Sequence, residues 1–142
     1  MKYLLDTDHI SFLQKQHGPE YAALIARMAK HSPTDFALSV VSFHEQVIGG
    51  HALLNRAPTS AHLIRGYALL LEIFQSYKTG PVLPFDAIAA TTFDGLLSQK
   101  FRVASMDLRI AAIALSQGLT LLTRNVRDFG RVPGLITEDW TV

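Results

Sequence analysis

Short apolar runs alternate with longer amphipathic stretches along the chain. Runs rich in Leu, Val and Phe predict strands, and apolar positions spaced three and four residues apart predict helices. The predicted strands cover residues 2–5, 36–41, 80–85, 119–123 and 135–137. The predicted helices cover residues 8–16, 19–31, 42–56, 61–77, 86–101 and 107–117. The two kinds of element therefore follow one another in regular alternation.

Alternating strands and helices require crossover connections, which join parallel strands. We therefore predict an α/β fold of three layers, with a central parallel sheet of four to five strands between helices. Prolines in the 80–85 strand favour a place at the edge of the sheet. The length of 142 residues suits one domain over residues 1–142. In such sheets, functional residues gather beyond the carboxyl ends of the strands.

The composition of the chain excludes several kinds of functional site. The chain has no cysteine, which excludes disulfides, thiolate nucleophiles and Cys-ligated zinc. The net charge of +1 gives no general attraction for polyanions, so any nucleic-acid contact depends on local clustering. No apolar run approaches the ~20 residues of a membrane span, and no targeting segment is visible, so we expect a cytoplasmic protein.

The mean hydropathy of +0.20 is high for a chain with few charges. Either a large core or an exposed apolar face accounts for it. The apolar positions of residues 63–74 are the expected face for a partner protein or a second copy of the chain.

Acidic residues cluster around the predicted carboxyl edge of the sheet. The six that adjoin it are Asp6, Asp8, Glu45, Asp86, Asp107 and Asp128. Carboxylates held close together in a cleft repel, so one takes up a proton or a divalent cation neutralises them. Oxygen ligands without His or Cys suit Mg²⁺ or Mn²⁺. Such an ion acts as a Lewis acid and activates water for phosphodiester hydrolysis.

Each acid also has a structural interpretation. Asp8, Asp86 and Asp107 stand where helix caps are expected. Ser42 and Glu45 fit the S-x-x-E capping box at the start of a helix. A carboxylate edge that only binds, without catalysis, is a further alternative. The histidines do not indicate zinc, because H-E-x-x-H is absent: position 48, after His44-Glu45, is Ile48.

Basic residues gather near the same edge. Between positions 100 and 131 the bases are Lys100, Arg102, Arg109, Arg124, Arg127 and Arg131, opposed only by Asp107 and Asp128. Arg109, Arg124 and Arg127 are the candidates for substrate binding, because the guanidinium fork suits phosphate. The alternative is a solvated face of ion pairs.

Four motifs resemble those of the PIN-domain ribonucleases. Residues 4–11 (LLDTDHIS) are similar to their N-terminal LLDTN-x-x-S motif, and residues 36–45 (FALSVVSFHE) to a strand that ends in an acid. Residues 106–115 (MDLRIAAIAL) resemble the D-x-x-I-A-A helix. Residues 121–135 (LLTRNVRDFGRVPGL) resemble the terminal motif. Found in this order, the motifs look like a VapC-type toxin of a type II toxin–antitoxin pair.

The resemblance implies a PIN-like fold, Mg²⁺-dependent endoribonuclease activity on RNA such as transfer RNA, a homodimer and a cognate antitoxin. The family's acids correspond to Asp6, Glu45 and Asp107, with Asp6 and Asp107 as the direct metal ligands. The fourth acidic position holds Asn125, and the nearby Asp128 is its candidate substitute. The resemblance also assigns supporting positions, which fall on Ser11, Thr123 and Asn125.

Two other functional classes remain open from the residues. A receiver-like signalling module places an acceptor Asp after the third strand, where Asp86 stands, but it also needs a Lys after the last strand, and the last Lys is Lys100. A haloacid-dehalogenase-type phosphatase begins with D-x-D, as in Asp6-Thr7-Asp8, but the usual Gly-Thr continuation is missing.

Overall fold

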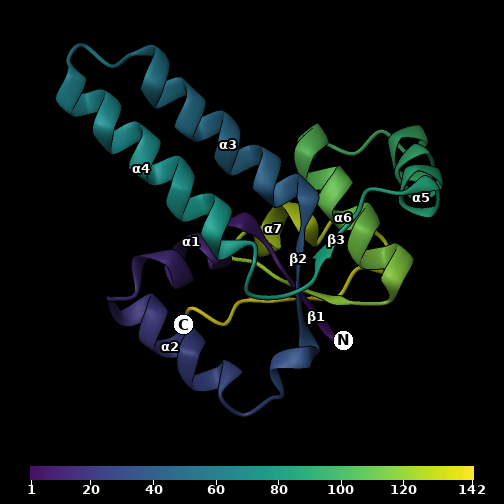
Figure 1. The fold of residues 1–142 in the computed structure, drawn as a ribbon. Coiled ribbons are helices and arrows are strands. Elements are labelled where there is room, and N and C mark those ends of the chain that lie inside the picture. Colours follow the sequence, from purple (N-terminus) through teal and green to yellow (C-terminus); the bar gives the residue numbers. More distant parts are fainter.

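Five short strands form one parallel sheet in the computed structural model, which describes all residues 1–142 (Figure 1). The strands are β1 (Tyr3–Leu5), β2 (Phe36–Ser39), β3 (Val82–Leu83), β4 (Thr120–Leu122) and β5 (Thr137–Glu138). They lie in the order β3-β2-β1-β4-β5, and every neighbouring pair is parallel. The predicted fold class is confirmed, as is the edge position of the proline-flanked β3.

Seven helices flank this sheet. They are α1 (Thr7–Lys15), α2 (Pro19–Met28), α3 (Val40–Asn55), α4 (Ser60–Ser76), α5 (Ala87–Ser98), α6 (Ser105–Gln117) and α7 (Val126–Phe129). A 3₁₀ turn, Pro33–Asp35, precedes β2. Every predicted helix is present. The four-residue α7 was not predicted, because one turn is too short to show a helical period.

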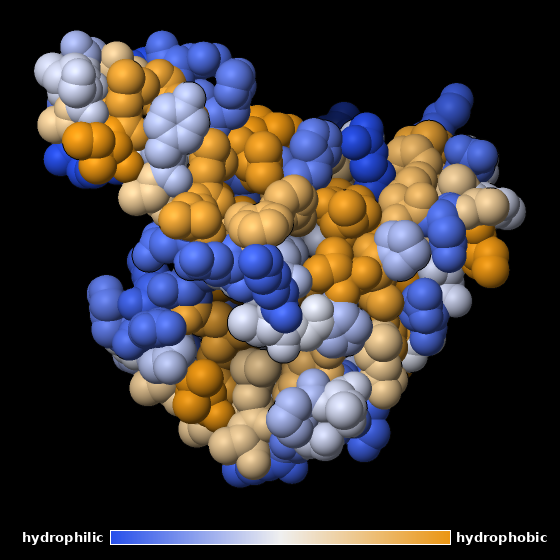
Figure 2. Space-filling model, in the orientation of Figure 1, coloured by the Kyte–Doolittle hydropathy of each residue, from blue (hydrophilic) through white to orange (hydrophobic).

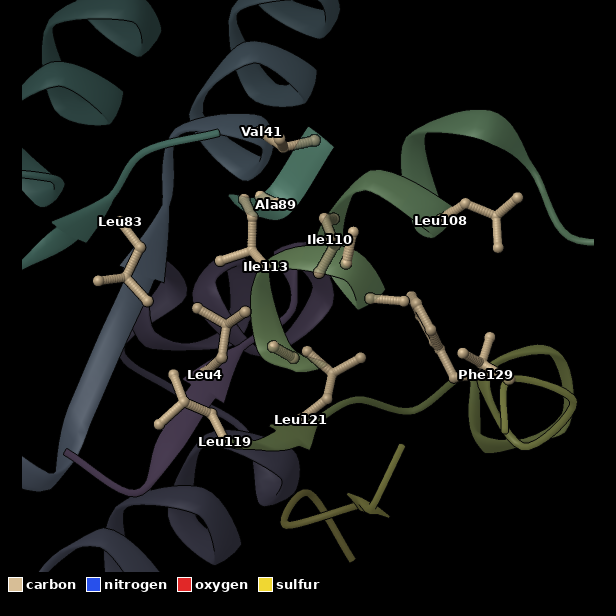
Figure 3. Packing of buried hydrophobic residues seen from close by; sticks show 14 of the residues in the cluster. Leu4, Val41, Leu83, Ala89, Leu108, Ile110, Ile113, Leu119, Leu121 and Phe129 are labelled. Atoms are coloured by element: carbon tan, nitrogen blue, oxygen red, sulfur yellow. The ribbon is translucent and has the colours of Figure 1, made fainter. Parts of the chain in front are cut away.

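The strands alternate their side chains between two cores, as buried parallel strands do. Leu4 and Leu121 belong to a core with α5 and α6, which includes Ile113 (Figure 3). Leu5 and Leu122 belong to a second core with α1, α2 and α4, which includes Trp140. Helices therefore cover both faces of the sheet, which gives the three predicted layers.

The boundary between β2 and α3 differs from the prediction. Val40 and Val41 continue the β-branched pattern of the strand, but they form the first turn of α3. The fully buried Ser39 caps this helix, since its Oγ accepts from the backbone N–H of Ser42 at 3.0 Å. The capping-box interpretation of Ser42 and Glu45 is therefore wrong, and Glu45 lies in the second turn of the helix.

An arm of two antiparallel helices, α3 and α4, projects from the sheet (Figure 1). Two glycines allow the close approach: a Cβ on Gly50 would lie 2.6 Å from a Leu70 methyl group, and one on Gly66 would lie 2.5 Å from a Leu54 methyl group. Figure 2 shows apolar side chains exposed along this arm. None of the helices combines the length and apolar character that a membrane crossing requires.

Helix α6 is the centre of the first core, so its truncation tests the packing. Ile113 is 1% exposed, whereas Ile88 on α5 is 66% exposed. We expect Ile113→Ala to lower the free energy of unfolding by about 2–5 kcal/mol, because it removes buried methyl groups and leaves a cavity. The matched Ile88→Ala should change it by less than about 0.5 kcal/mol. Urea denaturation measures both, and equal losses would contradict this packing.

Candidate active site

Asp6 stands where β1 ends and α1 begins, and it is 6% exposed. Its carboxylate accepts hydrogen bonds from the Thr123 hydroxyl at 2.7 Å and the Thr7 backbone N–H at 2.8 Å. The pKa of Asp6 rises to about 7 because of burial and then the charge of Asp8; the two hydrogen bonds oppose the rise, and Asp107 adds to it. A buried carboxyl next to other acids is typical of functional sites.

Asp107 lies in the first turn of α6, half-buried. Its pKa rises to about 6 because of burial, followed by the charges of Glu45, Asp128 and Asp8. No hydrogen bond or ion pair to its carboxylate occurs in the structure, although the other acids of this group have protein partners. The Asp107 oxygens are therefore free to bind a ligand.

Glu45 reaches the same region from α3. Its Oε1 accepts from the Thr7 hydroxyl at 2.9 Å, and that hydroxyl also lies 3.0 Å from the Ser42 hydroxyl. The pKa of Tyr77 is raised by burial and then by the charges of Glu45 and Asp6. This phenol therefore stays neutral beside the acids. Its hydroxyl donates to the Gln46 side chain at 3.0 Å.

Asp8 joins α1 to the segment after β4. Its Oδ2 accepts from the backbone N–H of Arg124 at 3.0 Å and lies 3.4 Å from the Thr123 hydroxyl. Its Oδ1 lies 2.7 Å from Nδ1 of His9. Asp8 therefore does not cap α1, as its position in the sequence suggested. Its carboxylate instead links the first turn of α1 to the segment after β4.

Asn125 and Asp128 form a pair at the candidate fourth acidic position. The Asn125 amide donates to Asp128 Oδ2 at 3.2 Å, and the Asn125 backbone N–H donates to the Thr123 hydroxyl at 3.0 Å. Asp128 also lies 3.6 Å from the Arg131 guanidinium. Asp128 lies in α7, and its charge raises the pKa of Asp107 in α6. Asp128 therefore acts on the same site.

We call Asp6, Asp8, Glu45, Asp107 and Asp128 the acidic edge. Their charges act on one another, but no three of them converge closely enough to form a ready-made metal cage. The donors present are carboxylate, hydroxyl and amide oxygens, which are ligands that suit Mg²⁺ or Mn²⁺. The chemistry of the donor set therefore fits the predicted metal.

The structure does not bring every predicted residue to this edge. Asp86 is exposed and caps α5, since its carboxylate accepts from the Ala89 backbone N–H at 3.0 Å. Ser11 donates to the Thr7 carbonyl at 3.0 Å and accepts from Gln46 at 3.3 Å, so it braces α1 against α3.

The three candidate arginines differ in exposure. Arg124 and Arg127 are exposed beside the acidic edge, and the Arg124 guanidinium lies over the Phe12 ring at 5.4 Å. Arg109 is half-buried and donates to the Met106 sulfur at 3.3 Å. Arg124 and Arg127 are therefore the more accessible to a phosphate.

Three contributors were missed from the sequence: Thr7, His9 and Tyr77. The position of Thr7 between two acids was the available signal for a shared hydrogen-bond donor. His9 stands next to Asp8 in the chain, but its burial is not visible in the sequence. Nothing in the sequence relates Tyr77 to Glu45, because the arm α3–α4 brings them together.

The raised pKa values of Asp6 and Asp107 predict a pH-dependent stability. Between the ordinary value of 3.8 and about 7, the folded chain holds protons that the unfolded chain has lost. This stabilisation is complete below pH 3.8 and is lost as the pH rises through 6 to 7. Relative to the unchanged protein in EDTA, Asp6→Asn should therefore gain stability as the pH rises from about 4 to about 7.

Urea denaturation at intervals across that range measures the difference between Asp6→Asn and the unchanged protein. Asp86→Asn is the control, because Asn also caps helices and Asp86 is exposed. A stability difference that is the same at both ends of the range would contradict the raised pKa of Asp6.

Comparisons with known proteins point to one family, although no protein-family model matches the chain. The tRNA(fMet)-specific endonuclease VapC of Salmonella typhimurium is 29% identical over 140 residues, covering 99% of this chain and 98% of the relative. Ribonuclease VapC1 of Haemophilus influenzae is 30% identical over 145 residues, covering 99% of each.

A solved structure agrees with these relatives. The DNA-bound VapBC complex from Salmonella typhimurium matches 99% of this chain and 98% of its own with a TM-score of 0.77 and 25% identity. The sequence likeness over nearly the full length, together with the shared fold, shows that this chain belongs to the VapC family of PIN-domain ribonucleases.

Proposed function

We propose that this ribonuclease is the toxin of a toxin–antitoxin pair and cleaves RNA with Mg²⁺ held at the acidic edge. The single observation that carries the metal dependence is the pair Asp6 and Asp107. Both carboxyls have raised pKa values because they are buried near other acids. A divalent cation relieves this repulsion and stabilises the ionised forms of both.

Asp6 and Asp107 are the proposed ligands, with Mn²⁺ as an alternative ion. Thr7 and Thr123 hold the Asp6 carboxylate in one orientation, while the Asp107 carboxylate has no protein partner to give up. When bound, the ion polarises the phosphate and lowers the pKa of water at the site. Hydrogen bonds that fix one ligand in advance reduce the entropy lost on binding.

Glu45 is the proposed base. Its Oε1 accepts from Thr7, and its Oε2 has no protein hydrogen bond, so this oxygen is free to take a proton from water. The water oxygen forms a bond to phosphorus as the bond to the departing ribose oxygen breaks, and that oxygen takes a proton from solvent water. The water proton passes to Glu45, and Asp128 adds negative charge near Asp107 that favours cation binding.

The proposed substrate is RNA, with transfer RNA as the class suggested by the Salmonella typhimurium relative's name. Arg124 and Arg127 are exposed and lie close in the chain to Thr123 and Asp128, which supports them as contacts for the phosphates of RNA. Arg109 is a weaker candidate because it is half-buried. A cytoplasmic location is part of the proposal.

Other functional classes are less well supported. A receiver-like module has the strand order 2-1-3-4-5, whereas this sheet has β3-β2-β1-β4-β5. Its acceptor position would be Asp86, which caps a helix away from the acidic edge. A phosphatase of the haloacid dehalogenase type would use Asp8 as a free acid, but His9 and Arg124 occupy both oxygens of that carboxylate.

Substitution of the proposed ligands tests catalysis directly. We expect Asp6→Asn and Asp107→Asn each to lower the RNA cleavage rate at least about 100-fold, because a neutral amide does not replace an anionic ligand. Asp86→Asn should keep full activity. Cleavage of a labelled RNA by purified protein measures the rates, and circular dichroism confirms that each variant is folded.

Chelation completes this test. EDTA should abolish cleavage by the unchanged protein, and added Mg²⁺ should restore it. Full cleavage in EDTA, or activity of Asp107→Asn equal to that of Asp86→Asn, would contradict the proposed role of the acidic edge.

Partners are the second part of the proposal. The matched Salmonella typhimurium structure is a VapBC complex, which supports an antitoxin partner. We also propose a homodimer through the exposed apolar face of α4. That face comprises Ile64, Tyr67, Leu71 and Phe74, each more than half exposed. Apolar patches of this kind are typical of protein interfaces.

A charge on this face tests the homodimer. Ile64 is 70% exposed on α4, and Ile88 is 66% exposed on α5. We expect Ile64→Glu to convert a dimer to a monomer, because an ionised group is costly to bury at an interface, while Ile88→Glu should leave the dimer intact. Sedimentation equilibrium measures the mass, and a monomeric unchanged protein would contradict the homodimer.

A further inference from the structure

His9 is a fully buried histidine in the first turns of α1, outside the group of proposed ligands. Both of its ring nitrogens have partners. Nε2 lies 3.2 Å from the backbone N–H of Trp140, and Nδ1 lies 2.7 Å from Asp8 Oδ1. A backbone N–H only donates, so Nε2 accepts and carries no proton. The ring proton is therefore on Nδ1, which donates to Asp8.

The C-terminal segment holds this tautomer in place. Trp140 is 2% exposed, and its ring stacks near His31 and lies under the Arg27 guanidinium, 4.9 Å away. Asp139 Oδ1 lies 3.8 Å from Nε2 of His9, but it accepts from the backbone N–H and hydroxyl of Thr141 at 2.9 and 2.6 Å. The backbone N–H of Trp140 is therefore the group that donates to Nε2 of His9.

Asp8 transmits this arrangement to the acidic edge. Its second oxygen accepts from the Arg124 backbone N–H and lies 3.4 Å from the Thr123 hydroxyl. That hydroxyl has one proton, which it donates to Asp6 at 2.7 Å. Because Asp8 already has His9 and Arg124 as donors, it does not compete with Asp6 for this proton.

We propose that His9 is a positioning residue for the metal site and acts through Asp8. Its Nδ1–H holds the Asp8 carboxylate against Arg124, which reserves the Thr123 hydroxyl for Asp6. This inference rests on the proposed function, because it assigns Asp6 as a metal ligand. Loss of the Nδ1–H frees Asp8 to rotate towards Thr123, so that Asp6 loses its fixed orientation. Partners that orient a ligand typically change metal affinity by 10–100-fold.

Two substitutions separate the two hydrogen bonds of His9. In His9→Asn the amide N–H₂ stands near the place of Nδ1 and still donates to Asp8. In His9→Gln the amide stands near the place of Nε2, so it keeps the contact with Trp140 and loses the one with Asp8. His17→Gln is the matched control, because His17 is exposed and has no hydrogen bond.

The experiment measures Mg²⁺ binding by the whole protein without RNA, using isothermal titration calorimetry, and then kcat and KM for RNA cleavage. We expect His9→Gln to bind Mg²⁺ about tenfold or more weakly and to lower kcat with little change in KM. His9→Asn should stay within about threefold of the unchanged protein. In an Asp8→Asn background, His9→Gln should weaken binding no further, because the two residues act through one contact.

A purely structural role would lower the melting temperature of both His9 variants and leave the Mg²⁺ affinity of folded protein unchanged, which would overturn the inference. Equal weakening in His9→Asn and His9→Gln would also overturn it. Nitrogen NMR of the unchanged protein tests it without substitution, since a neutral ring with its proton on Nε2 and none on Nδ1 would exclude the donation to Asp8. Failure of the unchanged protein to bind Mg²⁺ would instead overturn the proposed function, and this inference with it.

Discussion

The burial of several carboxylates close together at one edge of a parallel sheet is the constraint on which the site depends. Burial raises the pKa values of Asp6 and Asp107, and the charge of Asp8 on Asp6 and that of Glu45 on Asp107 raise them further. Such an arrangement costs folding free energy in the ionised form. The same cluster of carboxylates attracts a cation, and this attraction is the basis of the proposed Mg²⁺ chemistry.

Threonine hydroxyls and the two hydrophobic cores offset this cost in folding free energy. Thr7 links α1 to Glu45, and Thr123 links β4 to Asp6, so each acid is held by an element other than its own. The alternation of Leu4 with Leu5 and of Leu121 with Leu122 anchors β1 and β4 on both faces. The strand ends are therefore rigid where the acids stand, while Asp107 keeps its freedom.

The sequence predicted the alternation of elements, the parallel sheet and the placement of Asp6, Glu45 and Asp107 around one edge, because these follow from period and chain order. It did not predict that α3 begins at Val40, since the β-branched Val40 and Val41 favour a strand, whereas the cap from Ser39 begins the helix before them. It also did not reveal His9 as a buried contact of Asp8, because that contact depends on the position of the C-terminal segment. Contacts between residues that are far apart in the chain leave no pattern in the local sequence.

In the proposed function, Asp6 and Asp107 share one divalent cation. Anomalous diffraction from a crystal of the protein soaked in Mn²⁺ tests it most directly, because the ion itself is located. We expect a manganese peak within about 2.5 Å of a carboxylate oxygen of each residue. A peak elsewhere, or none at this edge at a concentration that supports cleavage, would contradict it.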